Sequence, residues 1–175
     1  MNRVMREEMV ALLPRLRRFA YGLTGNMADG DDLLQSACLR ALDRAEQWRP
    51  GTRLDSWMYR ILQNLWIDQI RAGRRREIAV DEDVMAAFPG GDQAREMEAK
   101  LGLAAVRREV AKLPAEQREV LLLVSIEGAS YKDAAEILDI PIGTVMSRLS
   151  RARLTLGQAL EDKDGAQTER TRARP

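Results

Sequence analysis

The chain has 175 residues and a formal net charge of +1, and its 45% hydrophobic content is typical of folded globular protein. It contains no histidine and a single cysteine, Cys38, so the commonest general base is missing and an internal disulfide is excluded. Most enzyme classes are therefore disfavoured, and no catalytic residue, metal or cofactor is expected. There is no signal peptide and no run of about 18 apolar residues, so we expect a cytoplasmic protein.

The N-terminal half predicts three helices, and no segment alternates as a strand would. The first should begin near Pro14, after a short turn of helix, because proline lacks an N–H group. The second should open within Asp29–Asp32, where acidic residues favour a helix N-terminus, and end near Trp48. The third should run from Leu54 to Gly73. The protein is therefore predicted to be all-α.

Charge is distributed unevenly in the middle of the chain. Residues 71–76 carry four arginines and no acid, whereas residues 77–100 carry seven acids and two basic residues. The second segment also contains a proline followed by two glycines, which is typical of a flexible linker. We therefore expect two small helical domains, residues 1–76 and 101–160, joined by an acidic linker over 77–100. Residues 161–175 have few apolar residues, which predicts a disordered tail.

A helix-turn-helix is predicted in the second domain. A helix from Ala115 to about Ile126 is followed by a short helix that Ser130 caps, and Pro141 prevents that helix from continuing. The next helix should begin at Gly143 or Thr144, with a core stripe on one side. Its other side carries hydroxyl and guanidinium groups suited to base edges and phosphates, and no acid interrupts it. These groups belong to Thr144, Ser147, Arg148 and Arg151. A solvated charged face is the structural alternative, but the helix-turn-helix pattern favours DNA binding.

Several segments resemble extracytoplasmic-function (ECF) sigma factors of the sigma-70 family. In the second domain these are residues 113–123 (LPAEQREVLLL), 130–138 (SYKDAAEIL) and 142–153 (IGTVMSRLSRAR). In the first domain they are residues 31–37 (DDLLQSA) and 55–65 (DSWMYRILQNL). The resemblance implies sigma region 2 in residues 1–76 and sigma region 4 in residues 101–160. The sequence departs mildly from the family pattern at Asp139, where glycine is common, and at Met146, where lysine is more frequent.

The resemblance also implies partners and contact residues. RNA polymerase core would be bound through the clamp helices of its largest subunit and through the beta flap, with the clamp helices contacting Asp32, Gln35 and Arg40. The minus-ten element of promoter DNA would be bound and opened by Trp48, Arg53, Asn64, Arg71, Arg74 and Arg75. The minus-thirty-five element would be read by Thr144, Ser147, Arg148 and Arg151. Trp48 could equally belong to the core, whereas Trp57 and Trp66 are expected there because they lie in an apolar stripe.

The family further implies a cognate anti-sigma factor, which could hold the protein at the membrane until a stress signal releases it. No small-molecule substrate and no obligate homo-oligomer are expected. One alternative is a sigma-like mimic that sequesters an anti-sigma factor, which the retained Arg148, Arg151 and the arginines of 71–76 disfavour, as does the lack of a receiver domain. Another is a plain helix-turn-helix regulator, for which no dimerisation element is evident. A nucleic-acid enzyme is least supported, because no carboxylate cluster for metal ions is present.

Overall fold

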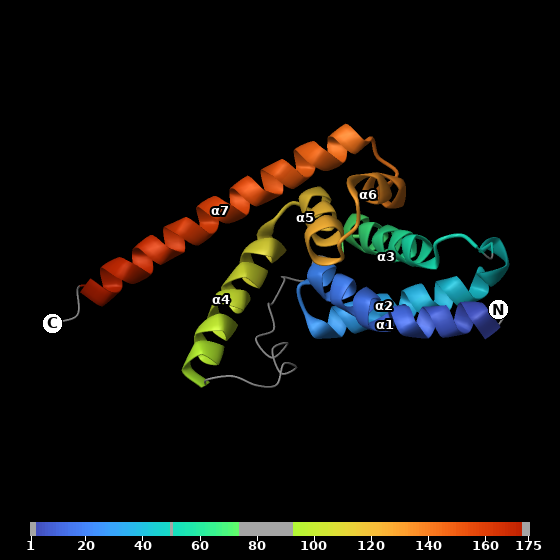
Figure 1. Cartoon of the computed structure of the whole chain (residues 1–175), viewed down its shortest axis with the longest axis horizontal. Coiled ribbons are helices and arrows are strands. Elements are labelled where there is room, and N and C mark those ends of the chain that lie inside the picture. The colour runs from blue at the N-terminus through green and yellow to red at the C-terminus, as the bar shows by residue number, and fades with distance from the viewer. Residues whose placement is uncertain (1–2, 50, 74–92, 173–175) are drawn as a thin grey trace.

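The computed structural model describes residues 3–49, 51–73 and 93–172, and every regular element in these ranges is a helix (Figure 1). The predicted all-α class is therefore confirmed. The elements are α1 (Arg3–Thr24), α2 (Met27–Asp43), η1 (Ala45–Gln47), α3 (Leu54–Arg71), α4 (Gln93–Lys112), α5 (Ala115–Leu121), η3 (Leu122–Ile126), α6 (Tyr131–Leu138) and α7 (Ile142–Arg172).

Helix α1 is continuous through Pro14, so the predicted start near that residue was wrong. Met5 and Met9 are buried on the same side of the helix as Leu16, which fixes the early turns by packing. Pro14 itself lies on the exposed side of the helix. Burial of one stripe therefore outweighs the local cost of a proline within the helix.

Helix α2 begins at Met27, earlier than predicted, because Asn26 serves as its N-cap. The Asn26 side chain accepts a hydrogen bond of 2.8 Å from the backbone N–H of Asp29. Helix α3 matches its prediction closely and packs across α1 and α2 (Figure 1). The rings of Phe19 and Tyr59 meet edge to face, 5.1 Å apart, at the α1–α3 contact. We call α1, α2 and α3 the N-terminal unit.

The C-terminal unit consists of α5, η3, α6 and α7. Helix α5 starts after Pro114, as predicted, and η3 is a π-helical turn that extends it to Ile126. Helix α4 begins at Gln93, inside the segment expected to be a linker. Helix α7 continues to Arg172, through most of the segment 161–175 expected to be disordered. That segment is rich in residues with high helix propensity, and extending an existing helix requires no new nucleation.

The two units pack directly on each other. Helix α6 contacts α3, while α5 and η3 contact α1 (Figure 1). Buried residues of both units belong to one hydrophobic cluster, in which Leu16 and Leu62 of the first unit join Val120 and Leu123 of the second. The N-terminal and C-terminal units therefore lie side by side in this structure.

Candidate nucleic-acid interface

Helices α6 and α7 form the predicted helix-turn-helix. The Ser130 side chain accepts a hydrogen bond of 3.0 Å from the N–H of Asp133, which caps α6. Ala134 of α6 and Val145 of α7 are fully buried, so the small alanine lets the helices cross closely. Between them Asp139 has φ of 54°, a left-handed conformation that aspartate tolerates better than most residues. This explains how Asp139 can stand where the family commonly has glycine.

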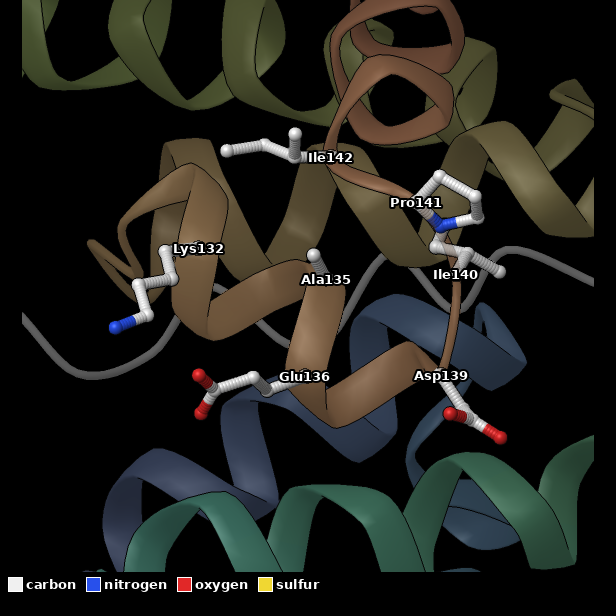
Figure 2. Close-up of a pocket in the computed structure, with 7 residues that line it drawn as sticks. All are labelled: Lys132, Ala135, Glu136, Asp139, Ile140, Pro141 and Ile142. Atoms are coloured by element: carbon white, nitrogen blue, oxygen red, sulfur yellow. The ribbon is translucent and has the colours of Figure 1, made fainter.

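The turn of this motif bears a shallow pocket on its outer side. Figure 2 shows its lining, from Lys132, Ala135 and Glu136 on α6 through the turn to Ile142. The walls are mainly apolar, and no group of three or more potential metal-ligating side chains occurs in the part of the chain that the structure describes. The charged side chains of Lys132, Glu136 and Asp139 complete the lining of the pocket.

The four predicted minus-thirty-five residues differ in their exposure and in whether acidic residues pair with them. Ser147 and Arg151 are exposed on α7, and Thr144 is half-buried. Arg148 instead turns toward α5, where its guanidinium lies 2.7 Å from the Glu116 carboxylate and 3.5 Å from that of Glu119. Only 20% of the Arg148 side chain is exposed. Arg151 is thus available for a groove, while Arg148 is held by two acids.

Glu119 is buried beneath Arg148. Its carboxylate accepts a hydrogen bond of 3.3 Å from the Gln63 amide of α3. Burial raises the pKa of Glu119 to about 7, although Gln63 and the Arg148 charge act in the opposite direction. A residue of α3 therefore contacts the acid that pairs with Arg148 of α7.

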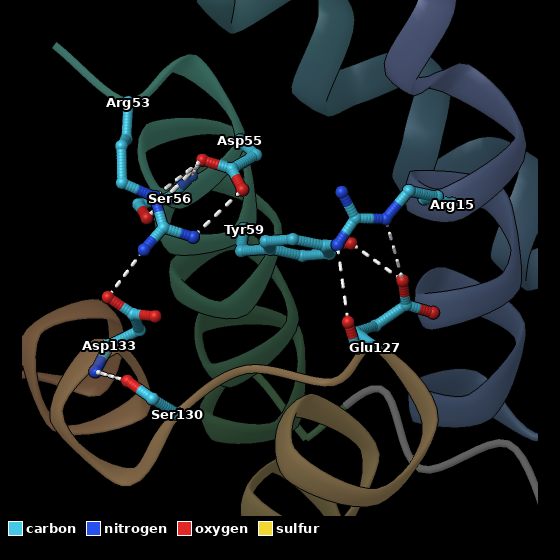
Figure 3. Close-up of polar contacts among 8 residues, drawn as sticks. All are labelled: Arg15, Arg53, Asp55, Ser56, Tyr59, Glu127, Ser130 and Asp133. Carbon is cyan, nitrogen blue, oxygen red and sulfur yellow. Dashed lines mark hydrogen bonds and ion pairs between the residues drawn. The ribbon is translucent and has the colours of Figure 1, made fainter.

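The predicted minus-ten residues lie along α3 and the loop before it. Arg53 is paired with Asp55 at 3.0 Å and with Asp133 of α6 at 2.5 Å, and this guanidinium lowers the pKa of both carboxyl groups (Figure 3). Asn64 is exposed, but it lines a cleft with Ile137 and Leu138 of α6. Arg71 is exposed at the end of α3. Arg74 and Arg75 lie outside the described residues.

The three tryptophans are all turned toward the core. Trp48 is 7% exposed, and no partner for its indole N–H is found among the described residues. Trp66 is buried and Trp57 is partly buried against the core, as expected. Stacking of Trp48 on a base would therefore require the η1–α3 loop to rearrange.

The predicted polymerase-contact residues are on α2. Asp32 and Gln35 are exposed one helical turn apart, whereas Arg40 is half-buried and points to a different side. Leu39 and Leu42 are 57% and 41% exposed and continue the stripe of Asp32 and Gln35 at helical spacing. Sequence reasoning missed these leucines, because a leucine in a helical pattern is usually assigned to the core.

A polar cluster between the two units was also missed. Glu127, at the end of η3, has a fully buried side chain and receives hydrogen bonds from Arg18 at 2.8 and 3.0 Å. The Tyr59 hydroxyl donates to the same carboxylate at 2.7 Å, and burial raises the pKa of Tyr59 (Figure 3). Arg15 adds a bond of 3.2 Å to the Glu127 carbonyl. Arg15 and Arg18 are three positions apart on α1, but Tyr59 and Glu127 lie far from them and from each other in the sequence, so no local pattern connects the cluster.

Arg118 makes a second buried connection. It is 5% exposed, and it donates a hydrogen bond of 2.7 Å to the carbonyl of Leu23 at the end of α1. Its guanidinium also lies over the Trp66 ring of α3, 5.6 Å from the ring centre. Burial lowers the pKa of Arg118 to about 10, well above neutral pH, so the side chain remains charged.

Comparisons with known proteins agree with this geometry. Residues 9–76 match the family described as sigma-70 region 2, and residues 103–156 match sigma-70 region 4. The chain is 40% identical over 169 residues to the ECF RNA polymerase sigma factor EcfG of Rhodopseudomonas palustris, covering 93% of this chain and 88% of that protein. No helix in the described ranges is long and apolar enough to span a bilayer.

Two solved structures are similar over most of their length. The sigma factor RpoE of Bartonella quintana, solved in complex with the anti-sigma factor NepR, has a TM-score of 0.73 and 31% identity, covering 91% of this chain and 98% of that one. CnrH in complex with the cytosolic domain of CnrY has a TM-score of 0.68 and 26% identity, covering 91% and 89%. With its region 2 and region 4 folds, its helix-turn-helix and its identity to EcfG, the chain belongs to the ECF family of RNA polymerase sigma factors.

Proposed function

We propose that this chain is an alternative sigma factor that binds RNA polymerase core and directs it to specific promoters. The observation that carries the proposal is the N-terminal part of α7, residues 142–160, which contains no acidic residue and exposes Ser147 and Arg151 on a helix-turn-helix. In this proposal α7 reads the minus-thirty-five element, and α3 with its preceding loop binds the opened minus-ten strand. The chain catalyses no reaction and needs no cofactor.

The polymerase-facing surface is proposed to lie on α2. Asp32, Gln35, Leu39 and Leu42 recur at intervals of three, four and three residues, which forms one continuous stripe. A helical partner, such as the clamp helices, could pack its side-chain ridges into the grooves of this stripe, which combines leucines with an acidic residue. The beta flap would engage the C-terminal unit. Binding both places on polymerase tethers two modest DNA contacts and raises their effective concentration.

Control by an anti-sigma factor is part of the proposal. RpoE was solved with the anti-sigma factor NepR and CnrH with the cytosolic domain of CnrY, and both resemble this chain over about nine tenths of its length. We propose that the protein is located in the cytoplasm, and that it is tethered to the membrane if the anti-sigma factor is itself a membrane protein. A stress signal would release the factor. We propose no obligate homo-oligomer and no small-molecule substrate.

A reconstituted transcription assay tests the proposal. Purified core polymerase is combined with genomic promoter fragments and this protein, and run-off transcripts are compared with those made without it. Discrete transcripts that depend on the protein are expected. If no fragment gives a transcript and no binding to core is measured, the sigma-like mimic becomes the better explanation.

The two arginines of α7 provide a matched pair of variants. Arg151→Ala should reduce transcription about 5- to 150-fold, because a lost base or phosphate contact costs about 1–3 kcal/mol. Arg148→Ala should reduce it less, since that guanidinium is already paired with Glu116 and Glu119. Equal losses for both variants would mean that Arg148 leaves its acids and contacts DNA directly.

A further inference from the structure

We propose that the C-terminal unit masks the minus-ten surface of the N-terminal unit, so that the free protein is closed and binds DNA poorly. This inference rests on the proposed function. It assigns to contacts within the chain a self-inhibition that needs no anti-sigma factor.

The first support is that α6 presents negative groups to the basic side chains of α3. Arg53 pairs with the Asp133 carboxylate at 2.5 Å (Figure 3). Arg60 donates to the backbone carbonyls of Glu136 and Ile137, the latter at 3.2 Å, in the last turn of α6. The carbonyl end of a helix carries partial negative charge. Carboxylate and carbonyl oxygens therefore bind guanidinium N–H groups that DNA phosphates would otherwise bind, and both arginine side chains keep part of their surface exposed.

The second support is the cluster around Glu127, which holds the C-terminal unit against the N-terminal unit. Its buried carboxylate is bound by Arg18, Arg15 and Tyr59 of the N-terminal unit. The π-helical turn aims it there: the Glu127 N–H bonds to the Leu122 carbonyl at 3.0 Å, and Gly128 follows with φ of 71°. A buried carboxylate that lost these partners would be strongly unfavourable. Opening must therefore hydrate Glu127 or give it new partners.

The third support is close packing at Gly22 of α1. A Cβ atom added at this position would lie 2.6 Å from a methyl carbon of Leu122, at the start of η3. The absence of a side chain thus lets the two units meet. At Gly157 of α7, by contrast, an added Cβ atom would meet nothing within 4 Å. These two helical glycines form a natural pair for testing the contact.

Promoter geometry requires the closed form to open. Elements centred near positions −35 and −10 are about 25 base pairs apart, or about 85 Å along B-form DNA at 3.4 Å per base pair. In this structure α3 and α6 are in direct contact, and Asn64 lies in a cleft beside Leu138. Both elements cannot be bound at once in this arrangement. Polymerase, by binding each unit at a separate place, would supply the free energy for opening.

The conformation of the free protein is the first test. Small-angle X-ray scattering is measured on the full-length wild type and on Glu127→Gln, Asp133→Asn and Gly22→Leu, with Gly157→Leu as control. We expect a compact wild type and control, and a larger radius of gyration for Gly22→Leu, Glu127→Gln and Asp133→Asn. Circular dichroism checks that each variant is folded. A wild type that is already extended would overturn the proposal.

Binding of single-stranded DNA without polymerase is the second test. The probe is fluorescein-labelled oligo(dT), since backbone contacts by Arg53 and Arg60 are independent of sequence. Gly22→Leu, Glu127→Gln and Asp133→Asn should bind at least about tenfold more tightly than the wild type, because apparent affinity scales with the population of the competent state. Gly157→Leu should match the wild type. Equal affinity for all five proteins would contradict masking.

A reversible lock separates this inference from the proposed function. Gly22→Cys and Leu122→Cys are combined in a Cys38→Ser background, so that oxidation joins α1 to η3. The oxidised protein should lose promoter-dependent transcription with core polymerase, and reductant should restore it. If the proposed function fails, neither form transcribes while scattering still reports closure. If masking fails, the oxidised protein transcribes as well as the reduced one.

Discussion

Glu119 illustrates how a single residue links the two units. Its carboxylate is buried between Gln63 of α3 and Arg148 of α7, and it is 3% exposed. Burial disfavours the charged form more than the two partners stabilise it, which raises the pKa of Glu119 to about 7. The protein therefore takes up a proton at this site on folding when the pH lies between the ordinary value of 4.5 and about 7.

The first prediction concerns the pH dependence of stability. Because the folded-state pKa of Glu119 is raised, its contribution to the free energy of unfolding is fully present below about pH 4.5 and is lost as pH rises through about 7. Glu119→Gln removes this loss while keeping a hydrogen-bonding group. The variant should gain on the order of 3 kcal/mol relative to wild type between pH 4.5 and 8.

Urea denaturation at several pH values measures this difference. Glu46→Gln, at an exposed position in η1, is the control and should follow the wild type. If the free energy of unfolding of Glu119→Gln and of wild type changed with pH in parallel, Glu119 would be charged in the folded protein without loss of stability.

Sequence alone could not have revealed this residue: Glu119 and Arg148 are 29 positions apart on different helices, and no periodicity relates them. By contrast, the exposed positions of Ser147 and Arg151 follow from the helical spacing of the core stripe in α7.

At the scale of elements, helix α1 keeps an internal proline at a local cost. Pro14 has no N–H to donate to the carbonyl of Val10, and it lies on the exposed side of α1. Pro14→Ala should therefore raise the free energy of unfolding by about 1–3 kcal/mol. Pro114→Ala is the control, since Pro114 precedes α5 as its N-cap and interrupts no helix. Thermal or urea unfolding measures both. A loss of stability in Pro14→Ala would mean that the proline ring makes favourable contacts.

The helices that sequence predicted best are those whose signals are local. Ser130 with Asp133, the break at Pro141 and the apolar stripe of α3 each define an element within a few residues. The predicted start of α1 near Pro14 was wrong, because burial of Met5 and Met9 outweighs the local tendency of proline to begin a helix. The π-helical turn η3 was not predicted either; it ends at Glu127, whose carboxylate pairs with Arg18 of the other unit.

At the scale of the whole molecule, the interface was beyond sequence reasoning because it joins surfaces that each unit could equally present to solvent or DNA. The two-domain division follows from composition and resemblance, but the mutual packing depends on buried long-range pairs. Arg118 with Leu23 and Arg18 with Glu127 are separated by 95 and 109 positions. Such pairs couple the unfolding of one unit to that of the other, because separating the units removes the partners of two buried charges in the C-terminal unit, those of Arg118 and Glu127.

This coupling predicts a single unfolding transition for the full-length protein. Differential scanning calorimetry should show one cooperative peak for the wild type and for Gly157→Leu, whose added side chain meets open space. Gly22→Leu should give two transitions, since a side chain there collides with Leu122 while the fold of each unit is left intact. Two transitions in the wild type would mean that the units unfold independently and that their contact contributes little free energy. One transition in the wild type and two in Gly22→Leu would show that the contact between the units stabilises both of them. The free energy of that contact would then be the amount that polymerase must supply to separate the units.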